Sequence, residues 1–133
     1  MSEQITYGRV ATVDLDFHEA VERVRSLLKE QGFGILCEID VAKTFKDKLG
    51  ADFPPYLILG ACNPQLAHRA LSAENQLGLL LPCNVVVQSR DGKTVVSAID
   101  AQKMLEVAGS PALREVARDA NVKLQTVIER LAV

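Results

Sequence analysis

The chain has 133 residues, of which 48% are hydrophobic and 24% charged, and its net charge is −2 at pH 7. This length suits one domain, over residues 1–133, that buries a core without structural metals or disulfides. The charge offers no general attraction for nucleic acid, and the longest apolar runs fall well short of the roughly 20 residues that a membrane helix needs. Three cysteines with no secretory signal favour a reducing compartment, so we expect a cytoplasmic protein.

The first part of the chain alternates strand and helix signals. Residues 5–13 are rich in β-branched side chains and predict a strand. Asp16 can cap a helix whose apolar residues recur at three- and four-residue spacing, and Gly32 ends it. Residues 34–39 predict a second strand, and residues 40–50 a short helix. The apolar residues of this short helix are expected to face the core: Val41, Phe45 and Leu49.

The middle of the chain repeats the pattern. The pair Pro54-Pro55 forbids helix and leads into an apolar strand at residues 56–61. Asn63 and Pro64 are then suited to the N-cap and first position of a helix that runs to about residue 73. Residues 77–82 favour neither helix nor strand.

A hairpin and two helices complete the chain. Two β-rich runs flank Asp91-Gly92, a turn pair that predicts a hairpin with Val87 opposite Val96 and Cys83 beside Asp100. Residues 100–108 predict a short helix and residues 111–131 a long one. The order is β-α-β-α-β-α-β-β-α-α, which indicates an α+β fold in which helices cover a mixed sheet.

The motifs of the familiar enzyme classes are absent. The sequence has no nucleotide or flavin fingerprint, no phosphate-binding glycine loop, no HExxH and no CxxC. Its serines lack the context of a hydrolase nucleophile. A non-enzymatic role is therefore favoured.

Two cysteines adjoin prolines at strand ends and are the main candidates for a site. Cys62 comes just before the helix at Pro64, where the helix dipole would stabilise a thiolate and lower its pKa. Cys83 opens the fourth strand. Both are also explained as small apolar residues buried at strand ends. They form one site only if the third and fourth strands are adjacent and antiparallel.

Neighbouring polar residues could assist such a site. His68 lies one turn into the helix after Cys62, and it either approaches the thiol or points into solvent. Asp100 is either the N-cap of the next helix or a third polar group of a site near Cys83. Asn63 lies at a helix end that could hold a phosphate or carboxylate. Cys37, in the middle of the second strand, is interpreted as a core residue.

Three segments of the sequence resemble a known family. They are GFGILCEIDVAKTFKDKLG, DFPPYLILGACNPQLAHRAL and LGLLLPCNVVV, and with the closing hairpin and helices the resemblance spans about residues 5–131. The family is the domain of unknown function 302 of bacteria and archaea. The resemblance implies a compact α/β domain that tends to form homodimers, and it implies no activity. The matching motif positions are Cys62, Asn63, Pro64, Pro82, Cys83 and Asn84.

Three functions are compatible with these observations. The first is a homodimeric module that binds a small ligand or a protein partner, with the long last helix as a dimer element. The second is a thiol site in which Cys62 and Cys83 hold a soft metal, such as Cu(I), or form a reversible disulfide. The third is an enzyme that binds an anion at the Asn63 helix end.

Overall fold

A computed structural model describes residues 5–132 and arranges them as one sheet with helices. The strands and helices follow in the predicted order, which confirms the α+β class. Two 3-10 helices, Asn75–Leu79 and Pro111–Leu113, lie between these elements. Among residues 5–132, no helix is both long and apolar enough to cross a membrane. The bounds of the main elements are β1 Gly8–Val13, α1 Phe17–Glu30, β2 Gly34–Asp40, α2 Val41–Leu49, β3 Tyr56–Cys62, α3 Pro64–Ala73, β4 Cys83–Arg90, β5 Lys93–Ile99, α4 Ala101–Glu106 and α5 Arg114–Leu131.

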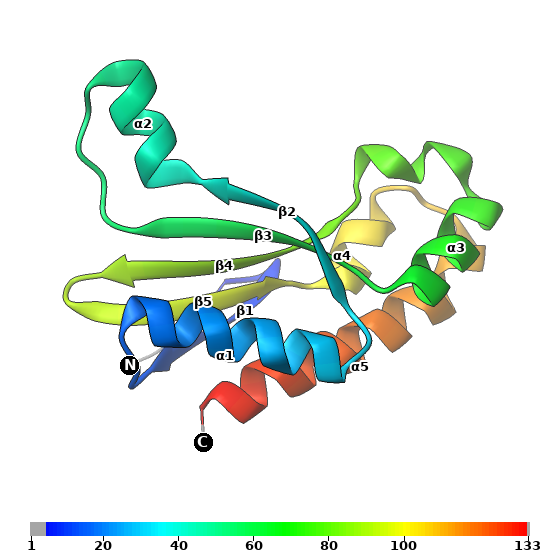
Figure 1. Cartoon of the computed structure of the whole chain (residues 1–133). Helices are drawn as coiled ribbons and strands as arrows, with labels where there is room; N and C mark the ends of the chain where they lie inside the picture. Colours follow the sequence, from blue (N-terminus) through cyan, green and yellow to red (C-terminus); the bar gives the residue numbers. More distant parts are fainter. Residues whose placement is uncertain (1–4, 133) are drawn as a thin grey trace.

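The sheet has the strand order β1-β5-β4-β3-β2, and all its pairings are antiparallel. It thus differs from the mixed sheet that we expected. Helices α2 and α3 lie at opposite ends of the sheet and reverse the chain between neighbouring strands, whereas α1 crosses the sheet to join its two edge strands (Figure 1). The predicted hairpin register is confirmed, since Val87 pairs with Val96.

Helices α1 and α5 cover one face of the sheet and form the core with it. Asp16 caps α1 by accepting a hydrogen bond of 2.8 Å from the Glu19 amide, and Gly32 ends the helix with φ at 82°. The apolar stripes of both helices pack on alternate residues of β4 and β5, such as Val85 and Val96, which are fully buried. Because the hydrophobic effect scales with the apolar area removed from water, this layer provides most of the stability.

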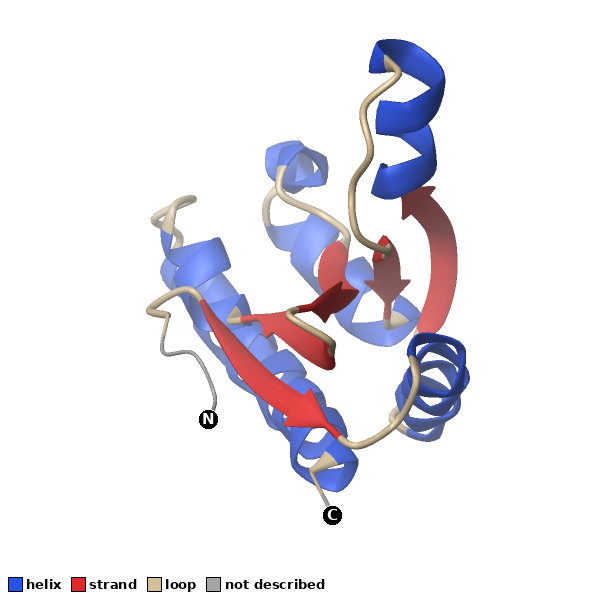
Figure 2. Ribbon diagram, turned by 90° about the vertical axis from the view of Figure 1, so that its left-hand side faces the viewer, coloured by secondary structure: helices blue, strands red, loops and turns tan. Residues whose placement is uncertain are grey.

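Helix α2 differs from the prediction, because none of its residues is buried. Val41 and Phe45 are half-buried, and Leu49 is 73% exposed. Figures 1 and 2 show α2 projecting beyond the end of the sheet, away from the other helices. A groove of about 620 Å³ separates it from α1. The apolar spacing identified the helix correctly, but the connection to β3 carries it off the core.

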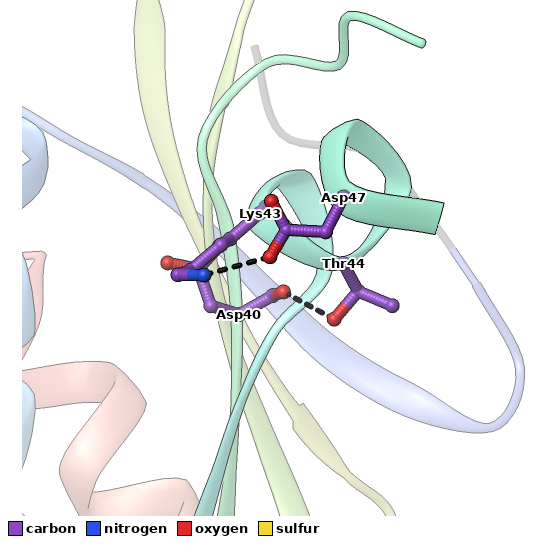
Figure 3. Close-up of polar contacts among 4 residues, drawn as sticks. All are labelled: Asp40, Lys43, Thr44 and Asp47. Carbon is purple, nitrogen blue, oxygen red and sulfur yellow. Dashed lines mark hydrogen bonds and ion pairs between the residues drawn. The ribbon is translucent and has the colours of Figure 1, made fainter. Parts of the chain in front are cut away.

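Local polar contacts hold α2 together instead. Asp40 accepts hydrogen bonds at both its carboxylate, from the Lys43 amide, and its carbonyl oxygen, from the Thr44 hydroxyl. Lys43 also forms an ion pair of 2.7 Å with Asp47 one turn on, as Figure 3 shows. The carboxylate raises the pKa of Lys43 by hydrogen bonding and by its charge. Such exposed pairs add little stability, so α2 is a marginally stable arm.

Candidate ligand cavity

The ends of β3 and β4 bring Cys62 and Cys83 to the same edge of the sheet. The two strands are adjacent and antiparallel, and Ala61 at the end of β3 pairs with Cys83 at the start of β4. The two cysteines therefore lie at the same end of the sheet. Cys83 is buried, at 8% exposure, and Cys62 is half-buried.

Both cysteines line a cavity of about 280 Å³. The sheet ends form its floor, and α3, α4 and α5 form its walls, since each contributes at least two small or apolar side chains. These side chains are Leu66, Ala67 and Ala70 of α3, Ala101, Met104 and Leu105 of α4, and Val116 and Ala120 of α5. Phe33, Leu36, Leu81 and Pro82 complete the rim.

The lining is almost wholly apolar. None of the described residues that surround the cavity is charged, and Asn63 supplies the one amide side chain. That amide is already engaged: its oxygen caps α3 by accepting from the Leu66 amide, and its nitrogen donates to the Gln31 carbonyl, each at 3.3 Å. An anion at this helix end would have to displace the Asn63 side chain. The cavity thus favours an uncharged occupant.

The apolar surroundings raise the pKa values of both thiols. Burial raises the pKa of Cys62, and burial together with the neighbouring charge of an ionised Cys62 raises the pKa of Cys83 to about 11. The low thiolate pKa expected at Cys62 was therefore wrong. The cause is the loss of hydration on burial, and Asn63 already caps the helix end that was expected to stabilise a thiolate. Both thiols are neutral at pH 7.

His68 and Asp100 do not line the cavity. His68 is exposed on α3 and does not approach the thiol, so the second of its two expected orientations, toward solvent, is the one found. Asp100 caps α4 by accepting from the Lys103 amide at 3.0 Å, and its carboxylate also accepts from Asn121 at 2.9 Å. Burial acts to raise the pKa of Asp100, but these hydrogen bonds, with help from the charge of Arg9, lower it overall. Its carboxylate is thus engaged in structural hydrogen bonds.

Cys37 corrects a second expectation, because it is exposed on edge strand β2 and not part of the core. Its sulfur lies over Gly60 of β3, where an added Cβ would come within 2.6 Å of it and within 2.9 Å of the Pro82 ring. Glycine at this position makes room for both groups. Among residues 5–132, however, no three Cys, His, Asp or Glu side chains converge on a point that could hold a metal ion.

Several cavity residues escaped the sequence analysis. The register of β2 shifts between Ile35 and Cys37, so Leu36 is an extra residue in a β-bulge at the cavity rim. The small residues Ala67, Ala70 and Ala120 leave the space between helices unfilled. Their spacing on α3 and α5 was the available signal, but alanines at such positions equally indicate close helix packing.

The fold and cavity define a class: a two-layer α+β domain with an antiparallel sheet and an apolar, thiol-bearing cavity at one sheet end. The family model "Domain of unknown function DUF302" matches residues 9–131, and the chain belongs to this family. The crystal structure of an uncharacterized conserved DUF302 protein from Bacillus stearothermophilus is similar, with a TM-score of 0.89 and 32% identity over 96% of this chain and 99% of that one. No curated protein matches the chain.

Proposed function

We propose that this protein is a binding module for a small, uncharged, mainly apolar molecule held in the cavity between α3, α4 and α5. The observation that carries this proposal is the lining, which combines apolar side chains with two neutral thiols and one capped amide. Ligand sites are typically concave and mostly apolar, with few polar groups. An apolar guest bound there would remove its own apolar surface and that of the lining from water.

The volume limits the size of the ligand. About 280 Å³ lies just below the usual range for drug-sized ligands and is about twice the roughly 150 Å³ that suffices for benzene. A substituted single ring or a short branched chain fits this space. Nucleotides and sugar phosphates are excluded by their size and by the absence of cationic groups in the lining.

Toluene and n-butylbenzene are suitable probes, and their binding can be followed by chemical-shift changes of methyl groups at Leu66, Met104 and Val116. Ala67→Phe fills the cavity from α3 and should abolish these changes. Ala73→Phe adds the same ring to an exposed position of the same helix and should leave them intact. Equal binding in both variants, or none in the wild-type protein, contradicts the proposal.

A second candidate function is a thiol site formed by Cys62 and Cys83. Its support is the register of β3 and β4, which places both cysteines at one end of the cavity. Two thiolates suit Cu(I), which accepts few, soft ligands. Alternatively, the pair could form a disulfide by losing two protons and two electrons to an oxidant such as diamide. The raised pKa values oppose thiolate formation and would slow either reaction.

Native mass spectrometry of anaerobic protein tests this candidate. Added Cu(I) should give one bound ion per chain, or diamide a loss of two hydrogens, and Cys83→Ser should remove either result. Cys37→Ser is the matched control and should keep it, because Cys37 does not line the cavity. A protein that binds no Cu(I) and keeps three free thiols after diamide treatment contradicts the thiol site.

A further inference from the structure

Sulfur atoms are concentrated at the cavity between α3, α4 and α5. The part of the chain that the structure describes contains four residues with sulfur, and three of them line this cavity: Cys62, Cys83 and Met104. They come from different elements, because Cys62 ends β3, Cys83 begins β4 and Met104 lies on α4. Leucine or valine would serve equally well to bury apolar surface, so the sulfur atoms add a property that hydrocarbon side chains lack.

One aromatic ring accompanies the sulfur atoms. Phe33 follows the Gly32 turn at the end of α1, is 5% exposed and is the one aromatic side chain among the described residues of the lining. Aromatic rings pair edge to face or offset, and such pairs stabilise by more than the area they bury. The polarizable sulfur of methionine or cysteine also makes favourable contacts with aromatic rings, often at the ring edge. An aromatic guest therefore uses these contacts better than a saturated one.

We propose that the occupant of the cavity is aromatic, a single ring with a short apolar substituent, and that Cys62, Cys83, Met104 and Phe33 select it over saturated hydrocarbons of the same size. This inference rests on the proposed function, because it names the class of ligand bound at the same site. The volume of about 280 Å³ holds one ring with room for a small substituent. Among the shapes that this volume allows, the proposal chooses the ring and rejects the branched chain.

The rigidity of a ring favours the same choice. A flexible chain loses rotational freedom when a cavity immobilises it, whereas the atoms of an aromatic ring are already fixed in one plane. Much of the lining is rigid too, because alanine has no side-chain rotamers to lose. These alanines are Ala61, Ala67, Ala70, Ala101 and Ala120. Lost conformational entropy therefore offsets little of the contact energy between a ring and this lining.

The protonation state of the thiols suits a ring better than a metal ion. Burial raises the pKa of Cys62, and burial together with the charge of an ionised Cys62 raises the pKa of Cys83 to about 11. A neutral thiol contacts a ring directly, whereas a metal ion such as Cu(I) must first displace its proton. The thioether of Met104 has no proton to lose. The same three sulfur atoms therefore favour an aromatic guest over the thiol site.

Two probes with the same number of carbon atoms separate aromatic character from size. The dissociation constants of toluene and methylcyclohexane are compared after each is corrected for its partition between water and cyclohexane, which removes the difference in hydrophobicity. Toluene should keep a corrected preference of about tenfold or more. It should also cause a ring-current shift at the Met104 methyl group that methylcyclohexane does not cause.

Volume-conserving substitutions locate the preference. Met104→Leu removes a sulfur atom from the lining and should reduce the corrected preference for toluene about two- to tenfold. Leu66→Met adds a sulfur atom to the lining and should increase the preference. Leu77→Met makes the same change in the core outside the cavity, at a residue that is 1% exposed, and should keep the preference of the wild-type protein.

The outcomes separate this inference from the proposed function. If both probes bind without a corrected preference, or if neither Met104→Leu nor Leu66→Met changes it, aromatic selection is overturned while the proposed function stands. A change in Leu77→Met as large as that in Leu66→Met overturns the role of the cavity sulfur atoms. If neither probe binds the wild-type protein, the proposed function itself fails, and aromatic selection fails with it.

Discussion

Helices α1 and α2 begin in the same way and end in different environments. Each starts at an aspartate whose side chain accepts a hydrogen bond from the amide three residues on, Asp16 for α1 and Asp40 for α2. Each carries apolar residues at helical spacing. Yet α1 buries five residues against the sheet, and α2 buries none. Local signals thus determine that a helix forms, whereas the connection between strands determines whether it reaches the core.

The largest difference between the two helices should appear when one leucine is shortened in each. Leu28 of α1 is fully buried, and Leu28→Ala should cost about 2–5 kcal/mol because it leaves a cavity. Leu49→Ala on α2 should cost less than about 0.5 kcal/mol in dilute protein. Urea denaturation at several protein concentrations is the measurement.

The cysteines allow a second comparison, between the buried Cys83 and the exposed Cys37. The raised pKa of Cys83 means that the folded protein holds a proton that the unfolded chain releases between about pH 9 and pH 11. The stability due to this group is therefore complete below pH 9 and declines above it, by about 2–3 kcal/mol at pH 11. Thermal unfolding of Cys83→Ala should show a smaller decline, because only the raised pKa of Cys62 then remains, whereas Cys37→Ala should retain the whole of it. Equal decline in both variants would contradict the assignment.

Polar contacts provide a third comparison. Asn121 is 5% exposed and bonds to the Ala101 amide, Asp100 and Gln102, so it joins α5 to the start of α4. Asn121→Ala should cost about 1–3 kcal/mol, because it leaves a buried amide without its acceptor. Thr44→Val removes an exposed hydrogen bond of the arm and should change stability by less than about 0.5 kcal/mol. Chemical denaturation of both variants measures the difference.

The smallest effect on the global stability of the protein is expected at the N-cap of α2. Asp40→Ala removes the acceptor for the Lys43 amide and should destabilise α2 by about 1 kcal/mol. Because the arm contributes nothing buried to the core, the melting temperature should stay unchanged while amide exchange in residues 41–49 accelerates. A clear drop in melting temperature would show that α2 is coupled to the core.

The sequence was sufficient to predict most elements and their order. Caps at Asp16, Asp40 and Asn63 and the turn at Asp91-Gly92 are local signals, and each marked a boundary that the structure contains. The direction of pairing in the sheet and the position of α2 depend on contacts between distant segments. Periodicity carries no information about these contacts, so the expected mixed sheet and the buried α2 did not appear.

The candidate cavity could be predicted only in part. The proline-flanked cysteines and Asn63 identified the end of the sheet where the cavity lies. The thiol pKa was predicted in the wrong direction, because it depends on helices α4 and α5, which are distant in sequence and remove water from the site. Cys37 was misplaced because a short apolar strand at a sheet edge has the same composition as one in the centre.

The pairing of β1 with β5 has a consequence for synthesis on the ribosome. Gly8 pairs with Ile99, about ninety residues later, and α5 then packs on both strands. At roughly 5–20 residues per second, the first strand waits on the order of ten seconds for its partner. During that time α1 has no completed sheet on which to bury its apolar face. The apolar face of α1 should therefore stay exposed on the nascent chain until β5 and α5 have been translated.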